Sequence, residues 1–564
     1  MKSLRKSSNQ LSSAKIFHQA MVLLAGVHAI EQHEAKIQVT IVATLQRRLF
    51  SAASIFAMIV AIRLVLIGLA PHADEGHYAA ASYFHYLGYT KGLFSEASFI
   101  PPFGILELYS LLVSWVYFIP AEPYFLLRLV DGLIAGFTGV VIFKYLNLAT
   151  NSRVPAYIAT AFVVVAINHP EFIEAGARNP IPIATLLLFC ALYLLERDGG
   201  SKVLLPACCL AGSVLVREPF IMFAGLVVLY VWQQHGLRVV VRLCWLATLF
   251  GASVILLVVA LKGGVSGAVA TYDAYTQFGN SNPTSNLTLP KRIELGVEHG
   301  QRIISILSFC FPAIMLGLVA PLFEPSLRTR KALSLYVLGV GLTLAPLVEI
   351  FLKRPYSYHV AQMFIGVGVF VSYGVQVFFI RLKNTHRQHP ITSWSLIILV
   401  VFGHLVLLQN YARTMRYAAG WSIHFAPVTI LGEWTSPAIA DSYYLQIASL
   451  VRNNSRPGDP ILSTSYNVYP LTGRIPLSRS SASLARYQMA ATAIEMEAEL
   501  PRLIREKRPR VFVEEWVLPS PQPKGVDTIV QAVSGRPQLS TQVGPDLSPY
   551  RRFVAKVHIY ADSL

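Results

Sequence analysis

The sequence predicts a polytopic α-helical membrane protein with about 11 transmembrane helices, followed by a C-terminal α/β domain. Three observations predict this class. Of the 564 residues 54% are hydrophobic, only 14% are charged, and long apolar runs recur between residues 49 and 411 but not after residue 438. Since one span needs about 20 predominantly apolar residues, the first part of the chain is a membrane module. A soluble multidomain enzyme is excluded.

The first 48 residues are basic, and their one apolar run, Met21 to Ile30, is too short to span a bilayer. Charge follows that run, where a secretory signal would have a small-residue cleavage site. We therefore expect an uncleaved cytoplasmic segment over 1–48. The net charge of +17 fits a positive-inside distribution in a polytopic chain better than nucleic-acid binding.

Mainly apolar runs bounded by charge or by Pro, Gly and Asn follow in order. They lie at 49–70, 125–146, 154–167, 181–195, 203–216, 220–232, 239–261, 303–323, 332–351, 360–380 and 394–408. The stretch 103–119 is ambiguous, because Glu107 interrupts it and prolines flank it on both sides.

Loop charge decides the ambiguous stretch. If 103–119 stays in the interface, the basic loops share the cytoplasmic side with the N-terminus, as the positive-inside rule requires. These loops hold Lys144, Arg153, Arg197, Lys202, Arg238, Arg242, Arg328, Arg330, Lys331 and the run from Arg381 to Arg387. We therefore predict a membrane module over 49–411, with a first outer loop at 71–123 and a long outer loop at 263–301.

Residues 412–564 are predicted to form an extracytoplasmic α/β domain. Helical periodicity at 442–451 and 482–500 alternates with the β-rich strings "PILSTSY", "RVFVEEWV" and "RRFVAKVHIY". The cysteines carry no ligand spacing, so neither a disulfide framework nor a zinc site is expected. No internal repeat is visible in the sequence.

The predicted outer loops concentrate chemistry-bearing residues on one membrane face. Asp74 and Glu75 follow the first span, with His77 and Tyr78 beside them. Further polar residues in the second and fourth outer loops are Glu171, Glu174, Arg178, Tyr272 and Asp273. A carboxylate pair suits general-base work on a hydroxyl, although carboxylate, His and Tyr side chains also decorate ordinary helix ends.

Cations also lie on this outer face, where the positive-inside rule makes them uncommon. Arg217 and Glu218 interrupt a long hydrophobic segment, so a helical hairpin with Arg217 at its outer tip avoids a charge in mid-membrane. Lys353 and Arg354 precede Tyr358 and His359 in "LKRPYSYHV". A bound phosphate explains such cations; a simple turn and snorkelling to lipid headgroups are the alternatives.

These residues together resemble the GT-C superfamily of polyprenyl-phosphate-sugar-dependent glycosyltransferases. The likeness is greatest to the branch of protein O-mannosyltransferases and lipid A aminoarabinose transferases. The likeness is seen in four elements: the Asp-Glu pair in "HADEGHYAAASYFHYLG", the Pro-Pro-aromatic element at Pro101 to Phe103, Arg217 in "LVREPF", and the Tyr-rich turn "LKRPYSYHVAQMF". The chain departs from the family pattern at Ile100, at Asn179 and in having Arg217 in place of a lysine.

The resemblance implies an inverting hexosyl- or pentosyltransferase in the cytoplasmic membrane, with its active site extracytoplasmic. Asp74 would be the general base and Glu75 would position it, while Arg217, Lys353, Arg354, Tyr358 and His359 would hold the donor phosphate. The remaining outer-loop residues named above would line the cavity. The implied partners are a polyprenyl-phosphate-linked sugar donor, a glycan, lipid or protein acceptor, and membrane lipids, without nucleic acid.

Two other readings stay open at this point. A transporter or flippase of a lipid-linked anionic substrate would also combine many helices with buried charge, and Arg63, Arg128 and Asp131 are charges within or near spans. A structural sensor that uses the C-terminal domain for binding is the other. The sequence names no certain cofactor; a divalent metal ion, the donor sugar, the acceptor and the oligomeric state are left undecided.

Overall fold

The computed structural model describes residues 51–65, 73–91, 108–121, 123–167, 180–261, 264–266, 269, 288–307, 311–352, 361–388, 443–465, 467–477, 493–518, 526–535, 537–544 and 552–560. The chain forms two compact units, 1–54 and 55–564. In the first unit, the Ser54 amide donates to the Ser51 hydroxyl over 3.1 Å, which caps the helix that follows. The predicted cytoplasmic segment 1–48 lies outside the described residues.

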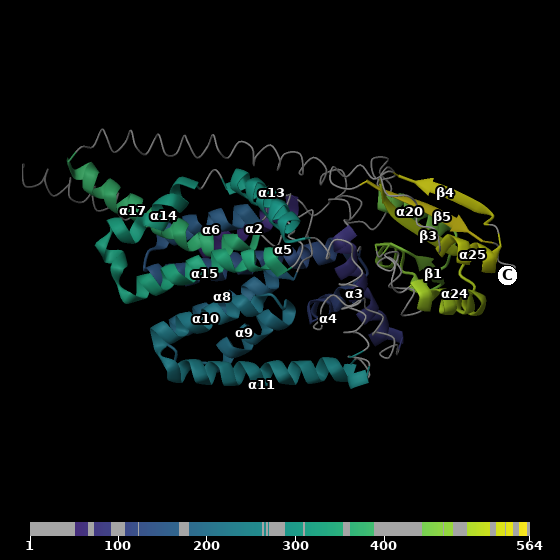
Figure 1. Cartoon of the computed structure of the whole chain (residues 1–564), viewed down its shortest axis with the longest axis horizontal. Helices are drawn as coiled ribbons and strands as arrows, with labels where there is room; N and C mark the ends of the chain where they lie inside the picture. Colours follow the sequence, from purple (N-terminus) through teal and green to yellow (C-terminus); the bar gives the residue numbers. More distant parts are fainter. Residues whose placement is uncertain are drawn as a thin grey trace, which may run out of the picture. The chain divides into compact units, whose positions relative to one another are not determined.

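The predicted apolar runs are helical wherever the structure describes them (Figure 1). Leu, Ile, Val and Phe dominate these segments, and a helix satisfies every backbone hydrogen bond within the segment, as lipid demands. The helices are α2 (Ala52–Val65), α5 (Pro123–Thr150), α6 (Arg153–Ile167), α8 (Ile181–Arg197), α9 (Leu204–Val216), α10 (Phe220–His235), α11 (Leu237–Leu261), α14 (Phe311–Phe323), α15 (Arg330–Leu352) and α17 (Phe364–Gln388).

Four of the described helices, α5, α11, α15 and α17, are long and apolar enough to cross a membrane by themselves. The run at 394–408 lies outside the described residues, so the number of spans stays a prediction. The ambiguous stretch contains α4 (Leu108–Val113) and the 3-10 helix η2 (Ser114–Phe118). The first part of that stretch, 103–107, lies outside the described residues, so its placement in the interface stays a prediction.

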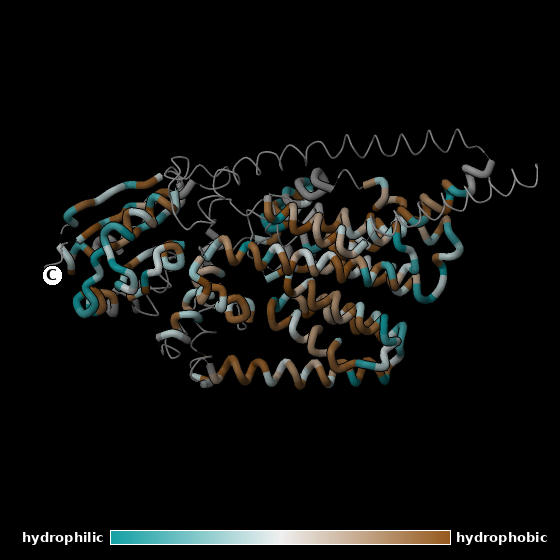
Figure 2. Tube along the Cα trace, turned by 180° about the vertical axis from the view of Figure 1, so that it is seen from behind, coloured by the Kyte–Doolittle hydropathy of each residue, from teal (hydrophilic) through white to brown (hydrophobic). Residues whose placement is uncertain are grey.

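Several helices turn at one end of the bundle, here called the basic end. Exposed Arg153, Arg197, Arg238, Arg328 and Arg381 lie in or beside these turns. In Figure 2 the turns of the bundle are hydrophilic, while the helix interiors are mostly hydrophobic. The described basic turns therefore share one end of the bundle, and the side of the membrane on which that end lies stays a prediction.

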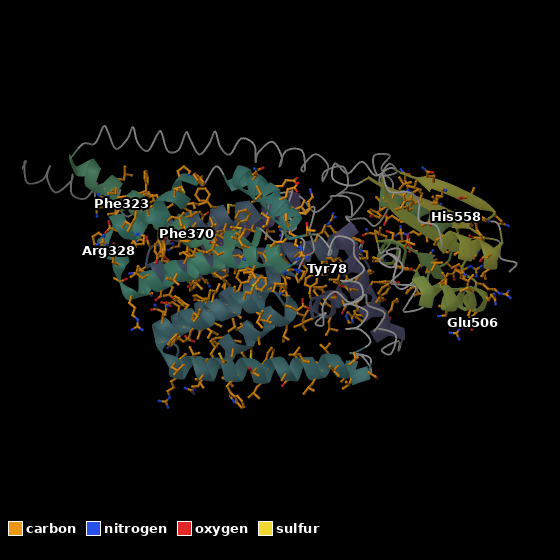
Figure 3. All side chains as sticks on the ribbon, viewed as in Figure 1. Tyr78, Phe323, Arg328, Phe370, Glu506 and His558 are labelled. Carbon is orange, nitrogen blue, oxygen red and sulfur yellow. The ribbon has the colours of Figure 1, made fainter. Side chains whose placement is uncertain are left out.

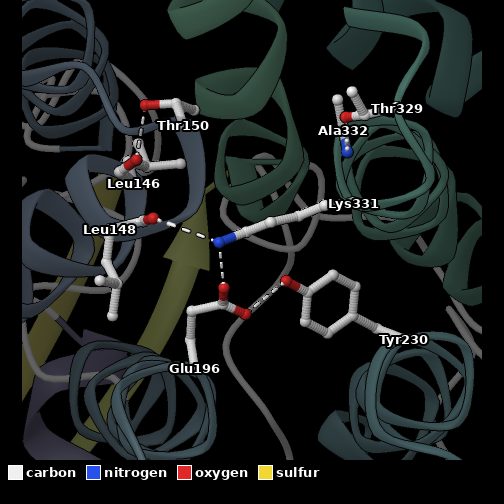
Figure 4. Close-up of polar contacts among 8 residues, drawn as sticks. All are labelled: Leu146, Leu148, Thr150, Glu196, Tyr230, Thr329, Lys331 and Ala332. Carbon is white, nitrogen blue, oxygen red and sulfur yellow. Dashed lines mark hydrogen bonds and ion pairs between the residues drawn. The ribbon is translucent and has the colours of Figure 1, made fainter. Parts of the chain in front are cut away.

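An ion pair between a partly exposed lysine and a buried carboxylate ties the basic end together (Figure 4). Lys331 at the start of α15 pairs with Glu196 at the end of α8, and its ammonium also donates to the Leu148 carbonyl of α5 over 3.4 Å. The Tyr230 hydroxyl of α10 donates to the other Glu196 oxygen over 2.9 Å. Since the Glu196 side chain is only 8% exposed, these donors offset the cost of burying its charge.

Gly236 alone joins α10 to α11. Its φ of +85° and ψ of 171° lie in a region that side chains with a Cβ avoid, so glycine is required at this reversal. Along α11, Trp245 and Leu256 are 63% and 70% exposed. Such an apolar outer flank fits a helix that faces lipid.

The helices α14 and α17 approach each other at glycines. A Cβ added at Gly317 would lie 1.8 Å from the Phe370 carbonyl oxygen, and one added at Gly374 would lie 2.0 Å from the Ala313 carbonyl oxygen. Small residues allow this kind of backbone contact between membrane helices. The Arg381 guanidinium also donates to the Phe323 carbonyl over 2.9 Å, which links the ends of the two helices.

The long outer loop predicted at 263–301 contains the start of a 19-residue helix, α13 (Leu289–Leu307). The predicted span at 303–323 is corrected, since its first residues belong to α13 and the apolar helix α14 begins at Phe311. Helix α13 is amphipathic, with Leu289, Ile293 and Val297 exposed at intervals of four residues. Apolar residues at this spacing form one stripe along the helix.

The C-terminal domain is an α/β domain, as predicted. Its sheet has the order β2-β1-β3-β5-β4, in which β1 pairs in parallel with β2 and β3, and β5 runs antiparallel to β3 and β4. The strands are β1 (Pro460–Ser463), β2 (Ile475–Pro476), β3 (Val511–Leu518), β4 (Leu539–Val543) and β5 (Arg552–Ile559). The helices are α20 (Tyr443–Asn453), α21 (Val468–Thr472), α24 (Ala493–Lys507) and α25 (Val526–Ser534).

This domain contacts the helical bundle through the segment that follows β1. The Tyr124 hydroxyl at the start of α5 donates to Asn467 Oδ1 over 2.5 Å, and both residues are buried. The ring of Tyr469 packs edge-on against Phe84 of α3 (Ala73–Lys91), with centroids 5.7 Å apart. The carboxyl end of β1 therefore faces the helices that carry the predicted carboxylate pair.

Candidate functional site

The structure describes part of the predicted site. Asp74, Glu75 and His77 lie in the first turns of α3, where the backbone is described but these side chains are not. The side chains of Tyr78 and Arg217 are described. The other predicted site residues lie outside the described residues; they are Glu171, Glu174, Arg178, Tyr272, Asp273, Lys353, Arg354, Tyr358 and His359.

Helix α3 is held against α4 and η2 by small residues and by tyrosines. Ala79 and Ala80 are fully buried, so neighbouring helices approach the backbone closely. The Tyr117 hydroxyl of η2 donates to the Ala79 carbonyl over 2.7 Å. Burial raises the pKa of Tyr83, which therefore stays protonated and is no base. Besides its two histidines, α3 then offers the first-turn carboxylates Asp74 and Glu75 as groups that can accept a proton.

A buried polar cluster lies one helical turn after Asp74. The Tyr78 ring meets the Tyr109 ring of α4 edge-on, with centroids 5.6 Å apart. The Tyr109 hydroxyl donates to the Asp131 carboxylate of α5, at 2.9 Å from Oδ1 and 3.2 Å from Oδ2. Tyr109 and Asp131 are each only 3% exposed. Since residues i and i+4 share a helix face, Tyr78 connects this cluster to the face that carries Asp74.

Helix α2 also reaches this cluster. A Cβ added at Gly132, the residue after Asp131, would lie 3.2 Å from Cβ of Arg63. The aliphatic stem of Arg63 therefore packs on α5 at Gly132, the residue after Asp131. The end of α2 thus meets the part of α5 that contains Asp131.

Arg217 lies at the break between α9 and α10, as the hairpin prediction required. Its backbone is extended, at φ −152° and ψ 110°, and the Phe220 amide that opens α10 donates to its carbonyl over 3.0 Å. Its side chain is half-buried, and its Nε is buried without a hydrogen-bond acceptor among the described residues. A buried guanidinium N–H without an acceptor is costly, and an anion would relieve that cost.

The Arg217 hairpin and α3 lie at the same end of the bundle. Helix α9 runs from the basic end to Arg217, and α4 contacts both α9 and α3. Figure 3 shows Tyr78 at one end of the bundle and Arg328, of the basic end, at the other. The structure thus brings the described predicted residues to one end, opposite the basic turns.

The cluster of Tyr78, Tyr109 and Asp131 is new relative to the predicted site. The sequence marked Asp131 as a charge near a span and placed Tyr109 in an ambiguous stretch, but nothing in their spacing pairs them. Among the residues whose side chains are described, no group of three or more His, Cys, Asp or Glu side chains could hold a metal ion. A metal bound by the first turn of α3 stays untested.

No protein-family model matches the chain, and no curated protein matches it. Among solved structures, it is similar to the crystal structure of ArnT from Cupriavidus metallidurans in the apo state. The two chains are 12% identical, the match covers 91% of this chain and 98% of that one, and the TM-score is 0.47. At this level of similarity, conclusions about the chemistry of the site can be drawn only from the residues of this chain.

Proposed function

We propose that this chain is an inverting membrane glycosyltransferase that moves a hexosyl or pentosyl group from a polyprenyl-phosphate donor to an acceptor hydroxyl. The reaction takes place at the end of the bundle opposite the basic turns. By the positive-inside rule that end is extracytoplasmic. The chain is then integral to the cytoplasmic membrane, with its C-terminal domain on the outer side.

The observation that carries the proposal is the buried, unaccepted Nε of Arg217 at the tip of a hairpin between two apolar helices. A guanidinium in that position suits a phosphate that arrives on a lipid, because the tail stays in the bilayer while the head meets the cation. The carboxylate pair on α3, at the same end, supplies the base that a hydroxyl nucleophile needs.

In the proposed reaction Asp74 takes the proton of the acceptor hydroxyl while the acceptor oxygen attacks the anomeric carbon. The bond from that carbon to the phosphate oxygen breaks, and the electron pair leaves with the polyprenyl phosphate. Arg217 stabilises the charge that develops on the leaving group, together with Lys353, Arg354, Tyr358 and His359. Attack opposite the leaving group inverts the anomeric centre.

The remaining predicted residues have supporting roles in this proposal. Glu75 orients Asp74 or the acceptor, and His77, Tyr78, Glu171, Glu174, Arg178, Tyr272 and Asp273 line the cavity. The donor sugar is unidentified, and the acceptor is a glycan, a lipid or a protein.

The test uses the purified full-length chain in lipid nanodiscs with a panel of synthetic polyprenyl-phosphate hexoses and pentoses. Release of polyprenyl phosphate that depends on added membrane extract as acceptor source is expected for at least one donor. Asp74→Asn should abolish release while donor binding persists. Asp198→Asn is the matched control, because that carboxylate is paired with Arg197 at the basic end. Full activity of the Asp74→Asn protein would remove Asp74 as the base.

A transporter or flippase remains the second candidate, since Asp131 is a buried charge within a predicted span. Transport predicts that sealed vesicles containing the chain move a polyprenyl-phosphate sugar across the bilayer without consuming it. Arg217→Ala would then lower the flux. Bond cleavage without net movement favours the transferase.

A further inference from the structure

We propose that Asp131 is a positioning residue that fixes the first turn of α3 through Tyr109 and Tyr78. This inference rests on the proposed function, because its value for the reaction is the placement of Asp74 and Glu75. Asp131 itself is buried in α5 and is not assigned contact with substrate.

The first step is the geometry of the cluster. The Tyr109 hydroxyl lies within hydrogen-bond distance of both Asp131 oxygens, at 2.9 and 3.2 Å. Because the hydroxyl lies within reach of both oxygens of one carboxyl group, small rotations of that group do not break the contact. The Tyr109 ring is thereby fixed, and its edge-on contact with Tyr78 is fixed with it.

The second step is where these contacts lie along the chain. Tyr78 is four residues after Asp74 and three after Glu75, so its anchor acts on the helical turn that carries both carboxylates. On the other side of that turn, α2 ends at Val65 after Arg63 has packed against Gly132. Contacts with the part of α5 around Asp131 therefore lie before and after the carboxylate pair along the chain, directly at Arg63 and through Tyr109 at Tyr78.

The third step separates this role from general stabilisation of α3. Tyr117 also makes a hydrogen bond to α3, but it does so at the Ala79 backbone carbonyl and not at the Tyr78 side chain. If Asp131 only stabilised the fold, removing the Tyr109 or the Tyr117 hydroxyl would have similar effects on α3. If Asp131 positions the first turn, the Tyr109 hydroxyl matters there and the Tyr117 hydroxyl does not.

The first experiment needs no substrate. A nitroxide is attached to Asp74→Cys in a full-length chain whose five natural cysteines are alanine, and its mobility is measured by electron paramagnetic resonance in nanodiscs. Tyr109→Phe and Asp131→Asn should each increase the mobility of the label and so narrow the central line of the nitroxide spectrum. Tyr117→Phe should leave the width of that line unchanged. Unchanged spectra for the first two variants, or equal narrowing with Tyr117→Phe, would overturn the anchor.

The second experiment measures transfer with whichever polyprenyl-phosphate sugar the unmodified chain accepts. Tyr109→Phe should lower kcat about tenfold, as misplacement of a reacting group does, with KM for the donor unchanged. An unchanged kcat in Tyr109→Phe, with transfer intact, would show that the anchor does not serve catalysis.

The two experiments keep the two proposals apart. If the unmodified chain transfers no sugar from any donor, the proposed function fails and the nitroxide spectra still decide whether Asp131 anchors α3. If transfer is normal and the spectra do not respond to the substitutions, the anchor fails and the proposed function stands.

Discussion

At the scale of single residues, Arg217 combines two features that rarely occur together in a membrane module. It interrupts an apolar segment, and its Nε is buried without an acceptor among the described residues. Residues that only form a turn usually direct such a charge to water. The sequence predicted this hairpin because a charge inside a long apolar run is expensive.

The polar cluster around Asp131 could not be predicted in the same way. Tyr109 and Asp131 are separated by 22 positions and lie on different helices. Their pairing depends on how α4 folds back on α5, and neither helical periodicity nor composition encodes that contact. The sequence thus indicates where charge must avoid lipid, but not which buried groups meet.

Substituting Arg217 should weaken donor use. Arg217→Gln removes the charge and is expected to lower kcat/KM for the polyprenyl-phosphate donor by about 10- to 100-fold, because hydrogen bonds to charged groups contribute about 1.5–3 kcal/mol. Arg217→Lys should recover part of this loss, since the charge returns without the planar fork. Initial rates at varied donor concentration measure the effect.

Arg197→Gln is the control for that series, because Arg197 is an exposed cation paired with Asp198 at the basic end. Its removal should leave kcat/KM unchanged. Equal losses for Arg197→Gln and Arg217→Gln would point to a general effect of net charge and would contradict a phosphate contact at Arg217.

At the scale of helices and strands, apolar runs were predicted well and their ends less well. The predicted start of the span at 303–323 lies within α13, because its first residues are apolar but belong to one stripe of an amphipathic helix. Because 263–301 was interpreted from its aromatic residues as an outer loop, the helix that begins within it was not predicted. Strand identities in the C-terminal domain were predictable from β-rich strings, whereas the insertion of β5 between β3 and β4 depends on long-range pairing.

The contact of α14 with α17 gives a prediction at this scale. Gly317→Ala places a Cβ 1.8 Å from the Phe370 carbonyl oxygen, so the two backbones must separate. Overpacking of this kind costs about 1–3 kcal/mol, and the thermal unfolding midpoint in detergent should fall.

Gly225→Ala is the matched control, because a Cβ at Gly225 in α10 meets nothing within 4 Å. Its unfolding midpoint should equal that of the unmodified chain or exceed it. A Gly317→Ala protein as stable as the Gly225→Ala protein would show that the α14 to α17 distance is adjustable.

At the scale of the whole molecule, the alternation of apolar runs and loops predicted which turns share an end of the bundle. Loop charge then assigned that end to the cytoplasmic side, because the rule counts Lys and Arg in short loops and needs no side-chain contact; this side stays a prediction. Neither signal predicts how the C-terminal domain attaches. That attachment uses Asn467 in the segment after β1, where the neighbouring residues gave no signal beyond β propensity.

The hydrogen bond between Tyr124 and Asn467 should couple the domain to the bundle. In a double-mutant cycle of Tyr124→Phe and Asn467→Ala, a coupling of about 1 kcal/mol is expected from thermal or denaturant unfolding, as for a buried hydrogen bond. Tyr124→Phe combined with Tyr443→Phe is the control. The Tyr443 hydroxyl bonds Glu515 within the C-terminal domain, so that pair should be additive.

Additive losses for Tyr124→Phe and Asn467→Ala would show that the domain is held by other contacts. The packing of Tyr469 on Phe84 would then be the next candidate.

The single-residue connection at Gly236 has a consequence for biosynthesis. Because only one glycine separates them, α10 and α11 must insert in opposite directions when they leave the translocon, so the orientation of one helix fixes that of the other. By the positive-inside rule, Arg238 and Arg242 in the first turns of α11 are expected to keep the start of that helix on the cytoplasmic side, which would set the direction of α10 as well. One pair of cations thereby sets the insertion of a whole hairpin, and with it the side of the membrane to which Arg217 is delivered.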